Sequence, residues 1–492
     1  MKANFIVLIG GWLVLVVHHV FFYYGHFGFD DLHYAELAYR LYGGDFDVTN
    51  PYSYRILPLL LIGLSYWLLG VTDLASALPA MGCSALILYT LYRLFRQEAW
   101  WKLLLAITLY FGMKWNLFYS DKLMPDIFVS TFAFVAWALY ERSRSREIHR
   151  VRYGLLAGFA LFLAFNAKGT VILLIPVFLI YVIDDVLRGR TAYWRGLVVS
   201  SSTLLIAYFI VCWLLTGSPV TRFTAISSSH YLNPCSYDSL PWSAMVDRLT
   251  RGYGQLLTDA GLWVHLFVAG ATLVLLGRQS AGRQPPLFYP ITVIVSLLAI
   301  NFMTISLTSY NPVCLDPRHI LLFSPILAVC TVRSLEFIFR RNRINTGSVS
   351  FRIGLGLLIV ALLWTSVEQA LYGRTLGYAA VKDAYRELID GTAGETVYYG
   401  SEVTKNLGRY FSAFETDGGT PRFRNVEDLP GCLDDQTSDV PIRLLQSWYG
   451  NWHAGLSEAD TRDTVIARGY NPGGGGETSI GPLTVVELPC AD

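Results

Sequence analysis

The stretch that decides the fold is NFIVLIGGWLVLVVHHVFFYY at residues 4–24, followed closely by GFDDLHYAELAYRLY at residues 28–42. Crossing about 30 Å of hydrocarbon takes roughly twenty helical residues, so the first stretch is long enough to span a membrane. It lacks a small-residue cleavage site, which favours an uncleaved helix over a signal peptide. In the second stretch, apolar and aromatic residues recur at helical spacing from Asp31, which predicts a short amphipathic helix on the membrane surface.

The rest of the chain repeats the apolar pattern of the first stretch. Of 492 residues, 53% are hydrophobic and 15% are charged, whereas a soluble domain carries about a quarter charged residues. We therefore predict an all-α polytopic membrane protein with about eleven transmembrane helices plus juxtamembrane helices. The apolar segments are 4–24, 74–95, 100–118, 124–140, 153–167, 170–187, 196–216, 257–277, 287–309, 318–338 and 351–371.

One further apolar run, at 56–69, is short, because fourteen residues make about 21 Å of helix. Basic residues decide how it is interpreted. If the run lies at the interface, the basic clusters between the apolar segments all fall on the side of Lys2. Lys and Arg concentrate in cytoplasmic loops. The run is therefore predicted to be a juxtamembrane helix, and the N-terminus to be cytoplasmic.

Three polar parts then fall on the non-cytoplasmic side, namely 25–73, 217–256 and the region from Arg374 onward. The last of these mixes helical and alternating patterns, which predicts a small soluble α/β domain at 374–492 after a membrane domain at 1–373. The helical stretches are 378–389 and 458–467, and the strand-like stretches are 396–399, 442–446 and 483–488.

Four cysteines, Cys235, Cys314, Cys432 and Cys490, lie in polar segments of this same side. They form two disulfides in an oxidising compartment or remain four thiols, and the sequence leaves both alternatives open. The chain contains no Asn-x-Ser/Thr glycosylation sequon. Its absence favours a bacterial or archaeal source over a eukaryotic secretory one. We expect a multi-pass protein of the bacterial inner (plasma) membrane.

Two adjacent carboxylates, Asp30 and Asp31, are the first candidates for chemistry. One of them is expected to cap the helix that follows. A single cap does not need two carboxylates, and a carboxylate at the membrane interface is well placed to take a proton from an attacking hydroxyl. The pair is also able to hold a divalent cation through oxygen ligands. Because arginine and lysine neutralise phosphate equally well, the presence of a metal stays open.

The motif DDLHYAE at residues 30–36, directly after a first membrane helix, resembles the Asp-Glu-x-x-Tyr-Ala-Glu element of bacterial aminoarabinose transferases. More loosely, it is similar to the acidic pair of protein O-mannosyltransferases. The resemblance implies a membrane glycosyltransferase of the GT-C type, which moves a sugar from a polyprenyl-phosphate carrier to a lipid, glycan or protein acceptor. It also implies that Asp30 is the catalytic carboxylate, with Asp31 standing where relatives carry Glu.

Further segments continue the resemblance and suggest additional site residues. Asp126 in DKLMPD would correspond to a second acidic position of these relatives, although Pro-Asp is also an ordinary helix start. The expected phosphate-binding residues are Arg55 in RILP, Lys168 in NAKG, and Arg318 and His319 in DPRHILLFSP. An arginine fork suits a departing phosphate. Each also has a plainer interpretation, such as snorkelling for Arg55, an interfacial turn for Lys168 and a satisfied helix-start residue for His319.

Other functions find less support. The chain has no Gly-x-Ser-x-Gly, Walker, Cys-x-x-Cys or His-Glu-x-x-His motif, and a net charge of +1 gives no indication of nucleic-acid binding. A transporter or lipid flippase is an alternative, but transporters generally show paired repeats and a binding site at the bilayer midplane. A polysaccharide polymerase or ligase, which uses similar lipid-linked donors, is a second alternative. The sequence does not indicate which sugar or acceptor is used.

Overall fold

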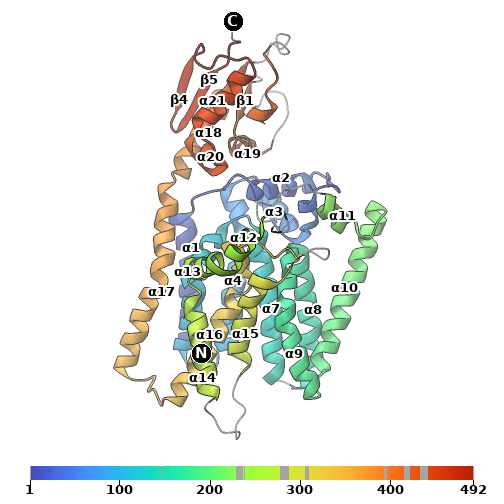
Figure 1. Ribbon diagram of the computed structural model, residues 1–492, viewed down its shortest axis with the longest axis vertical. Helices are drawn as coiled ribbons and strands as arrows, with labels where there is room; N and C mark the ends of the chain where they lie inside the picture. Colours follow the sequence, from blue (N-terminus) through green and yellow to red (C-terminus); the bar gives the residue numbers. More distant parts are fainter. Residues whose placement is uncertain are drawn as a thin grey trace.

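The computed structural model describes residues 2–145, 147–228, 237, 239–277, 287–304, 310–392, 396–414, 421–432 and 441–490. A bundle of long helices occupies one end of the molecule, and the C-terminal region is stacked on the other end (Figure 1). The bundle helices are α1 (Lys2–Phe22), α4 (Asp73–Phe95), α5 (Trp100–Gly112), α7 (Pro125–Ser145), α8 (Arg150–Ala167), α9 (Ile175–Leu187), α10 (Ala192–Thr216), α14 (Trp263–Gly277), α15 (Phe288–Phe302), α16 (Ser324–Arg341) and α17 (Val349–Thr375).

Each predicted apolar segment overlaps one of these helices. The helices differ in length, and not all of them are long enough to span a membrane. Five helices in the described part of the chain are long and apolar enough to cross a membrane, or up to seven if two bent helix pairs each count as one span. Helices such as α5, with 13 residues, are too short to cross about 30 Å alone. The finer prediction of about eleven spans is therefore not confirmed by helix length.

The short apolar run is a helix with the predicted bounds, α3 (Ile56–Leu69). It lies beside α2 (Asp30–Tyr42) at the end of the bundle that faces the C-terminal region (Figure 1). After α3 the chain turns at Gly70, and α4 begins where the Thr72 side chain accepts the amide of Ala75. This cap satisfies one of the free amides at the helix start. The helical assignment of 56–69 is thus confirmed, and its end of the bundle also carries the predicted site residues.

Packing within the bundle depends on close approach as well as on apolar side chains. Phe95, Trp137 and Ile326 are fully buried in its core. Helices α8 and α10 approach so closely that a Cβ atom on Gly154 would lie 2.0 Å from the carbonyl oxygen of Tyr193. Small residues at such crossings let helix backbones pack tightly in a membrane, where the hydrophobic effect does not drive association.

Shorter helices connect the bundle on the side of α2. They are α6 (Lys114–Phe118), α11 (Thr221–Ser228), α12 (Trp242–Asp247) and α13 (Tyr253–Asp259). Three 3₁₀ segments lie next to or carry predicted site residues. They are η1 (Pro51–Tyr54), η4 (Gly169–Leu174) and η6 (Pro317–Leu322).

The C-terminal region is a five-stranded sheet with helices, as the mixed sequence pattern predicts. The strand order is β2-β1-β3-β5-β4, in which β1 pairs in parallel with β2 and β3, and β5 pairs antiparallel with β3 and β4. Sequence analysis misses β2 and β4, which are short and largely exposed. The strands are β1 (Val397–Gly400), β2 (Arg422–Asn425), β3 (Ile442–Ser447), β4 (Glu477–Ile480) and β5 (Leu483–Glu487), and the helices are α18 (Tyr378–Gly391), α19 (Glu402–Phe411), α20 (Trp448–Ala454) and α21 (Glu458–Ala467).

One disulfide joins Cys432 to Cys490 across 58 residues, with their Cα atoms 5.7 Å apart. It ties the segment after β2 to the end of the chain. Of the two cysteine alternatives, the structure therefore favours disulfide formation for this pair. Cys235 lies outside the described residues, so a second pair is not decided.

Candidate active site

Asp31 closes the turn that leads into α2. Its carboxylate accepts the backbone amides of Phe27, Gly28 and Phe29 at 2.6, 3.0 and 3.1 Å, and the residue is only 1% exposed. The turn requires glycine at position 28, where φ is +85° and a Cβ atom would lie 2.3 Å from Val403. Burial raises the pKa of Asp31, but His26 and the amides lower it more, so the pKa lies below its ordinary value. Asp31 thus holds the turn before α2. The N-cap position of the helix is Phe29, so the prediction that one of the two aspartates is the N-cap is wrong.

Asp30 is the open member of the pair, because 29% of its side chain is exposed. Tyr52 donates a hydrogen bond to its Oδ1 atom at 3.2 Å, and the Nη1 atom of Arg318 lies 3.1 Å from its Oδ2 atom. The two oxygens therefore face groups from η1 and η6, which are distant in sequence. A carboxylate with solvent access and a fixed arginine neighbour is able to orient an incoming hydroxyl or amine.

Asp126 and Lys168 form an ion pair with a distance of 2.6 Å between Nζ and Oδ1. Both residues are buried, and the Oδ2 atom of Asp126 has no hydrogen-bond partner among the described residues. A buried pair of this kind is costly to form and is destabilised strongly when one partner is removed. Lys168 is therefore already neutralised by Asp126, and it contributes less free positive charge than the sequence suggests.

His319 lies beside this pair, but its hydrogen bonding differs from that expected for a phosphate donor. Its Nδ1 atom is 2.9 Å from the carbonyl oxygen of Cys314, which can only accept, so Nδ1 carries the proton. In the neutral imidazole the Nε2 atom is then unprotonated. This arrangement disfavours the predicted role of His319 as a donor to a phosphate oxygen, since its only proton is already used.

Arg55 is a cation of the site and packs against two aromatic rings. Its guanidinium group lies over the rings of Tyr52 and Tyr34, 4.7 and 5.2 Å from their centroids. Among the described residues it forms no ion pair with a carboxylate. Burial lowers its pKa to about 10, while Asp126 and Asp30 oppose that decrease. Arg55 therefore stays charged at neutral pH and keeps its hydrogen-bonding fork available.

Arg222 of α11 is a further cation that sequence analysis misses. It is buried, donates to the carbonyl oxygen of Phe165 at 2.9 Å and lies 4.1 Å from the centroid of that ring. Together with Arg318 it is close enough to lower the pKa of Arg55. No sequence motif identifies Arg222 as a site residue. The only feature that points to it is its position in the 217–256 segment, which is predicted to lie on the same side of the membrane as the first loop.

The two aspartates of the first loop do not form a shared metal site. Asp31 is occupied by three amides, and Asp30 faces Arg318 and Tyr52. In the described residues no group of three or more His, Cys, Asp or Glu side chains is arranged to hold a metal ion. The donor set therefore does not fit the divalent cation considered from the sequence, and we assign it no step.

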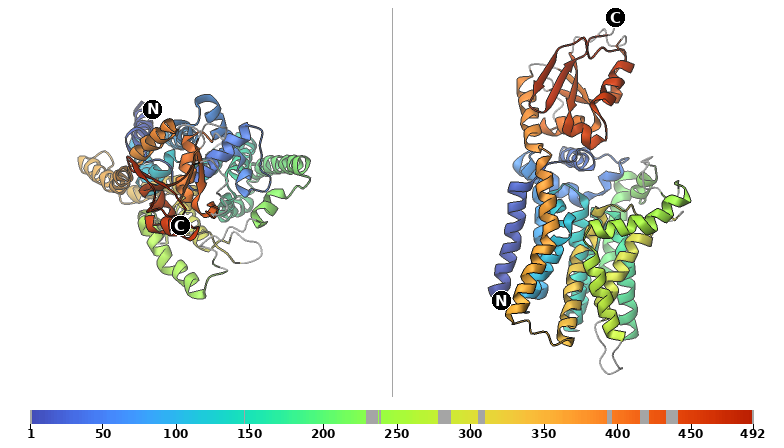
Figure 2. Two further views of the ribbon diagram at one scale, coloured as in Figure 1. Left: turned by 90° about the horizontal axis from the view of Figure 1, so that it is seen from above. Right: turned by 60° about the vertical axis from the view of Figure 1, so that its left-hand side comes forward.

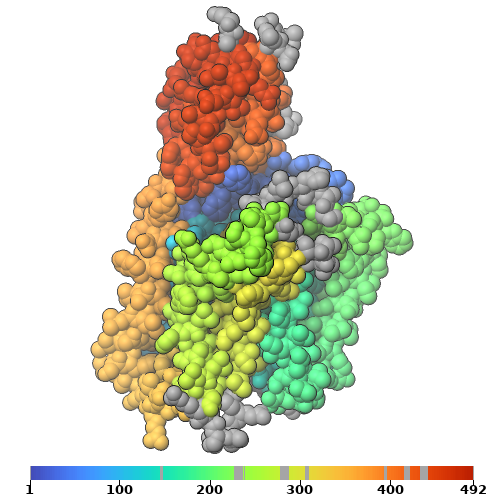
Figure 3. All heavy atoms as spheres, in the orientation of Figure 1, coloured from blue at the N-terminus to red at the C-terminus, as the bar shows by residue number. Residues whose placement is uncertain are grey.

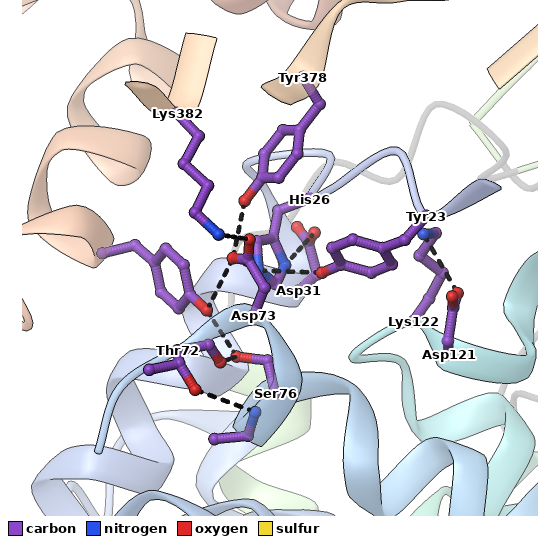
Figure 4. Close-up of polar contacts among 12 residues, drawn as sticks. Tyr23, His26, Asp31, Thr72, Asp73, Ser76, Asp121, Lys122, Tyr378 and Lys382 are labelled. Carbon is purple, nitrogen blue, oxygen red and sulfur yellow. Dashed lines mark hydrogen bonds and ion pairs between the residues drawn. The ribbon is translucent and has the colours of Figure 1, made fainter. Parts of the chain in front are cut away.

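The C-terminal region contacts the loop that carries both aspartates. His26 lies between Asp31 and Asp73, at 3.5 and 3.6 Å, and Lys382 and Tyr378 of α18 reach Asp73 from above (Figure 4). Figures 2 and 3 show the same region resting on the first-loop segment. The buried network therefore joins the first loop, the start of α4 and α18.

Three further contacts fix this docking. Asn406 donates to the carbonyl oxygen of Gly28 at 2.7 Å, and Tyr449 donates to that of His26 at 2.7 Å. Arg409 of α19 pairs with Glu36 of α2 at 2.6 Å. Glu36 belongs to the DDLHYAE motif, so part of that motif holds the C-terminal region. None of these contacts is visible in the sequence, because their partners are more than 370 residues apart.

A cavity of about 440 Å³ lies beside the segment that carries Arg318. Its lining includes Leu315 and Pro317 from that segment, and Asp247, Gln255 and Asp259 from α12 and α13. This volume is typical of a small-molecule site. Neither Asp30 nor Arg55, Arg222 or Arg318 lines it, and Pro317 is the neighbour of Arg318 in the chain.

Comparison with solved structures identifies the fold. The chain is similar to ArnT from Cupriavidus metallidurans bound to undecaprenyl phosphate, with a TM-score of 0.59 and 13% identity over 98% of this chain and 97% of that one. It is also similar to the oligosaccharyltransferase AglB from Archaeoglobus fulgidus in complex with an inhibitory peptide and a dolichol-phosphate, with a TM-score of 0.50 and 13% identity over 99% and 74% of the two chains. No protein-family model and no curated protein matches the sequence.

The fold is that of GT-C membrane enzymes, and the chain is an integral membrane protein. Within that fold, the aminoarabinose transferase ArnT matches over nearly the full length of both chains. The resemblance that the first-loop motif indicated is therefore confirmed at the level of the fold.

Proposed function

We propose that this protein is a membrane glycosyltransferase that moves a sugar from a polyprenyl-phosphate donor to a lipid, glycan or protein acceptor. Two solved structures of the same fold support a donor of this class, since ArnT is bound to undecaprenyl phosphate and AglB is in complex with a dolichol-phosphate. The observation that carries the proposal is the arrangement at Asp30. A partly exposed carboxylate contacts Arg318 and shares its surroundings with the charged Arg55.

In the proposed reaction, Asp30 accepts a proton from the acceptor hydroxyl or amine. The freed electron pair attacks the anomeric carbon of the sugar, and the bond between that carbon and the phosphate oxygen breaks. The phosphate leaves with the bonding electrons, and Arg55 and Arg318 stabilise its negative charge through forked hydrogen bonds. Lys168 and Asp126 form the buried wall of the phosphate site. Direct displacement inverts the anomeric centre.

The proposed topology places this site on the non-cytoplasmic face. Basic residues in the last turns of α4, α7 and α16, such as Arg93, Arg142 and Arg340, support a cytoplasmic assignment for the opposite end. The disulfide of the C-terminal region supports an oxidising compartment. We infer a multi-pass bacterial inner-membrane protein with about eleven spans, a membrane domain at 1–373 and a non-cytoplasmic domain at 374–492.

The test is transfer by the purified full-length protein from labelled polyprenyl-phosphate sugars. Replacing Asp30 by Asn removes the base, so the rate should fall about 100- to 10,000-fold. Asp45→Asn is the matched control, because Asp45 lies in the same loop but is exposed and pairs only with Arg40 among the described residues. Undiminished transfer by Asp30→Asn would exclude Asp30 from the mechanism. A parallel reaction with a diphosphate-linked donor distinguishes a polysaccharide polymerase or ligase.

A further inference from the structure

A second polar cavity lies at the opposite end of the bundle from the candidate active site. Helices α4 and α7 begin beside that site, so their last turns, together with the start of α15, lie at the far end (Figure 1). The cavity measures about 460 Å³, within the range of about 300–1,000 Å³ that is usual for small-molecule sites. Its charged lining consists of five arginines and two glutamates, namely Arg93, Arg96, Arg142, Arg144, Arg333, Glu98 and Glu141.

The glutamates do not balance this positive charge. Five arginines against two glutamates leave a formal excess of three positive charges around the cavity. Glu98 is already held by two hydrogen bonds from Arg333, at 2.7 and 2.8 Å, and Glu141 accepts from Tyr289. An ion pair next to the cavity, Lys102 with Glu336, does not change this excess, because its two charges cancel. The remaining charge therefore lacks a counter-ion supplied by the lining.

Three of the arginines have no acidic partner in the described part of the chain, and two of them, Arg93 and Arg144, are held by aromatic side chains. Among the residues that the structure describes, Arg93, Arg96 and Arg144 pair with no carboxylate. Arg93 donates to the Tyr89 hydroxyl at 2.8 Å, while its Nε atom is buried without a hydrogen-bond partner. Arg144 lies 4.1 Å from the centroid of the Phe288 ring. These contacts fix the side chains around the cavity and leave donor atoms unused.

We propose that this cavity binds a phosphate-bearing anion. Partly desolvated like charges repel one another, and a bound anion would relieve that repulsion. The planar fork of arginine matches phosphate oxygens with two parallel hydrogen bonds. The exposed side chain of Tyr89, which accepts from Arg93, lies next to the cavity. The anion is therefore a phospholipid headgroup or a soluble phosphate compound, and basic pockets between membrane helices bind anionic headgroups in this manner. This inference does not depend on the proposed glycosyltransferase activity.

The experiment uses delipidated full-length protein in a neutral detergent. Native mass spectrometry measures binding of phosphatidylglycerol and of zwitterionic phosphatidylcholine with the same acyl chains. We expect the wild type to prefer phosphatidylglycerol, and the double variant Arg93→Gln/Arg96→Gln to bind it about tenfold more weakly. Arg152→Gln is the matched control, because Arg152 is exposed at the start of α8, outside the cavity. It should keep the wild-type preference.

A second arm identifies the source of the phosphate. If inorganic phosphate displaces phosphatidylglycerol and raises the thermal midpoint of the wild type, a soluble phosphate compound suffices as ligand. If only the lipid binds, the ligand is a headgroup. The charge-preserving variant Arg93→Lys/Arg96→Lys controls for misfolding. Its affinity for phosphatidylglycerol should lie between those of the wild type and the glutamine variant. Equal affinity of the wild type for both lipids, or an unchanged preference in the glutamine variant, would overturn the proposal.

Discussion

Asp30 and Asp31 are adjacent and chemically identical, yet the fold gives them different surroundings. Asp31 is buried against three backbone amides, whereas Asp30 faces Arg318 and solvent. A carboxylate whose lone pairs are taken by amides is committed to structure, and one with open lone pairs is available for chemistry. The sequence shows two adjacent carboxylates near the helix start, but it does not show which one binds the turn amides.

This difference predicts opposite effects for two similar substitutions. Asp31→Asn replaces one of two acceptor oxygens by an NH2 group, which cannot accept the amide protons, so the free energy of unfolding should fall by about 1–3 kcal/mol. Asp30→Asn should leave stability nearly unchanged, because partly exposed ion pairs contribute only about 0–1 kcal/mol. Thermal unfolding of both variants in detergent checks the expectation. Equal midpoints for wild type and Asp31→Asn would contradict the role of Asp31 in holding this turn.

At the scale of elements, the turn before α2 is held by a charge network that reaches α4 and α18. His26 is its centre, because it lies between two carboxylates and also contacts the Tyr23 hydroxyl. Burial lowers the pKa of His26, but Asp31 and Asp73 raise it more, so the pKa lies above the ordinary value of 6.5. The protonated imidazole is therefore the form that stabilises the turn.

The network gives stability a defined pH dependence. The contribution of His26 is fully present below pH 6.5 and is lost as the pH rises through its raised folded-state pKa. The contribution of Asp31 is present above its ordinary pKa of 3.8 and is lost as the pH falls through its lowered value.

We expect the thermal midpoint of the wild type to exceed that of His26→Gln most at about pH 6 and least at about pH 9. The measurement is a series of unfolding curves for both proteins across this range. A gap that stays constant with pH would show that the charge on His26 does not contribute.

At the scale of the whole molecule, the C-terminal region and the membrane bundle meet at the candidate active site. Residues from α18, α19 and α20 contact the first loop and α2. The start of α2 that carries Asp30 therefore contacts η6 through Arg318, and the turn before it contacts the C-terminal region, which lies above it (Figure 1). Its conformation depends on docking between two parts of the chain that are far apart in sequence.

A charge exchange tests this dependence. Arg409→Glu places two like charges together at Glu36 and should reduce transfer activity a few-fold, with a lower thermal midpoint. The double variant Glu36→Arg/Arg409→Glu restores opposite charges and should recover most of the loss. Transfer assays and unfolding curves on the two single variants and the double variant complete the cycle. Additive losses in the double variant would show that the pair is not coupled.

Much of the fold follows from the sequence, because hydropathy and periodicity are local properties. The apolar segments, the short helix at 56–69 and three of the five C-terminal strands could be predicted from neighbouring residues alone. The number of membrane spans is harder to predict, because an apolar segment can be longer than the helix it forms. The helix α5, for example, is shorter than the apolar segment that contains it. The strands β2 and β4 were not predicted, because each has only four residues and at most one of them is buried.

The sequence by itself determined that this chain is a helical membrane protein with an acidic pair after its first helix, since length and hydrophobicity suffice for that. Only the tertiary structure decided which aspartate is open, that Arg222 joins the site, and that Cys432 pairs with Cys490. It also decided which arginines surround the second cavity. The physical reason is that hydrogen bonds, ion pairs and burial depend on distance in space, and these partners are brought together by packing across tens to hundreds of residues.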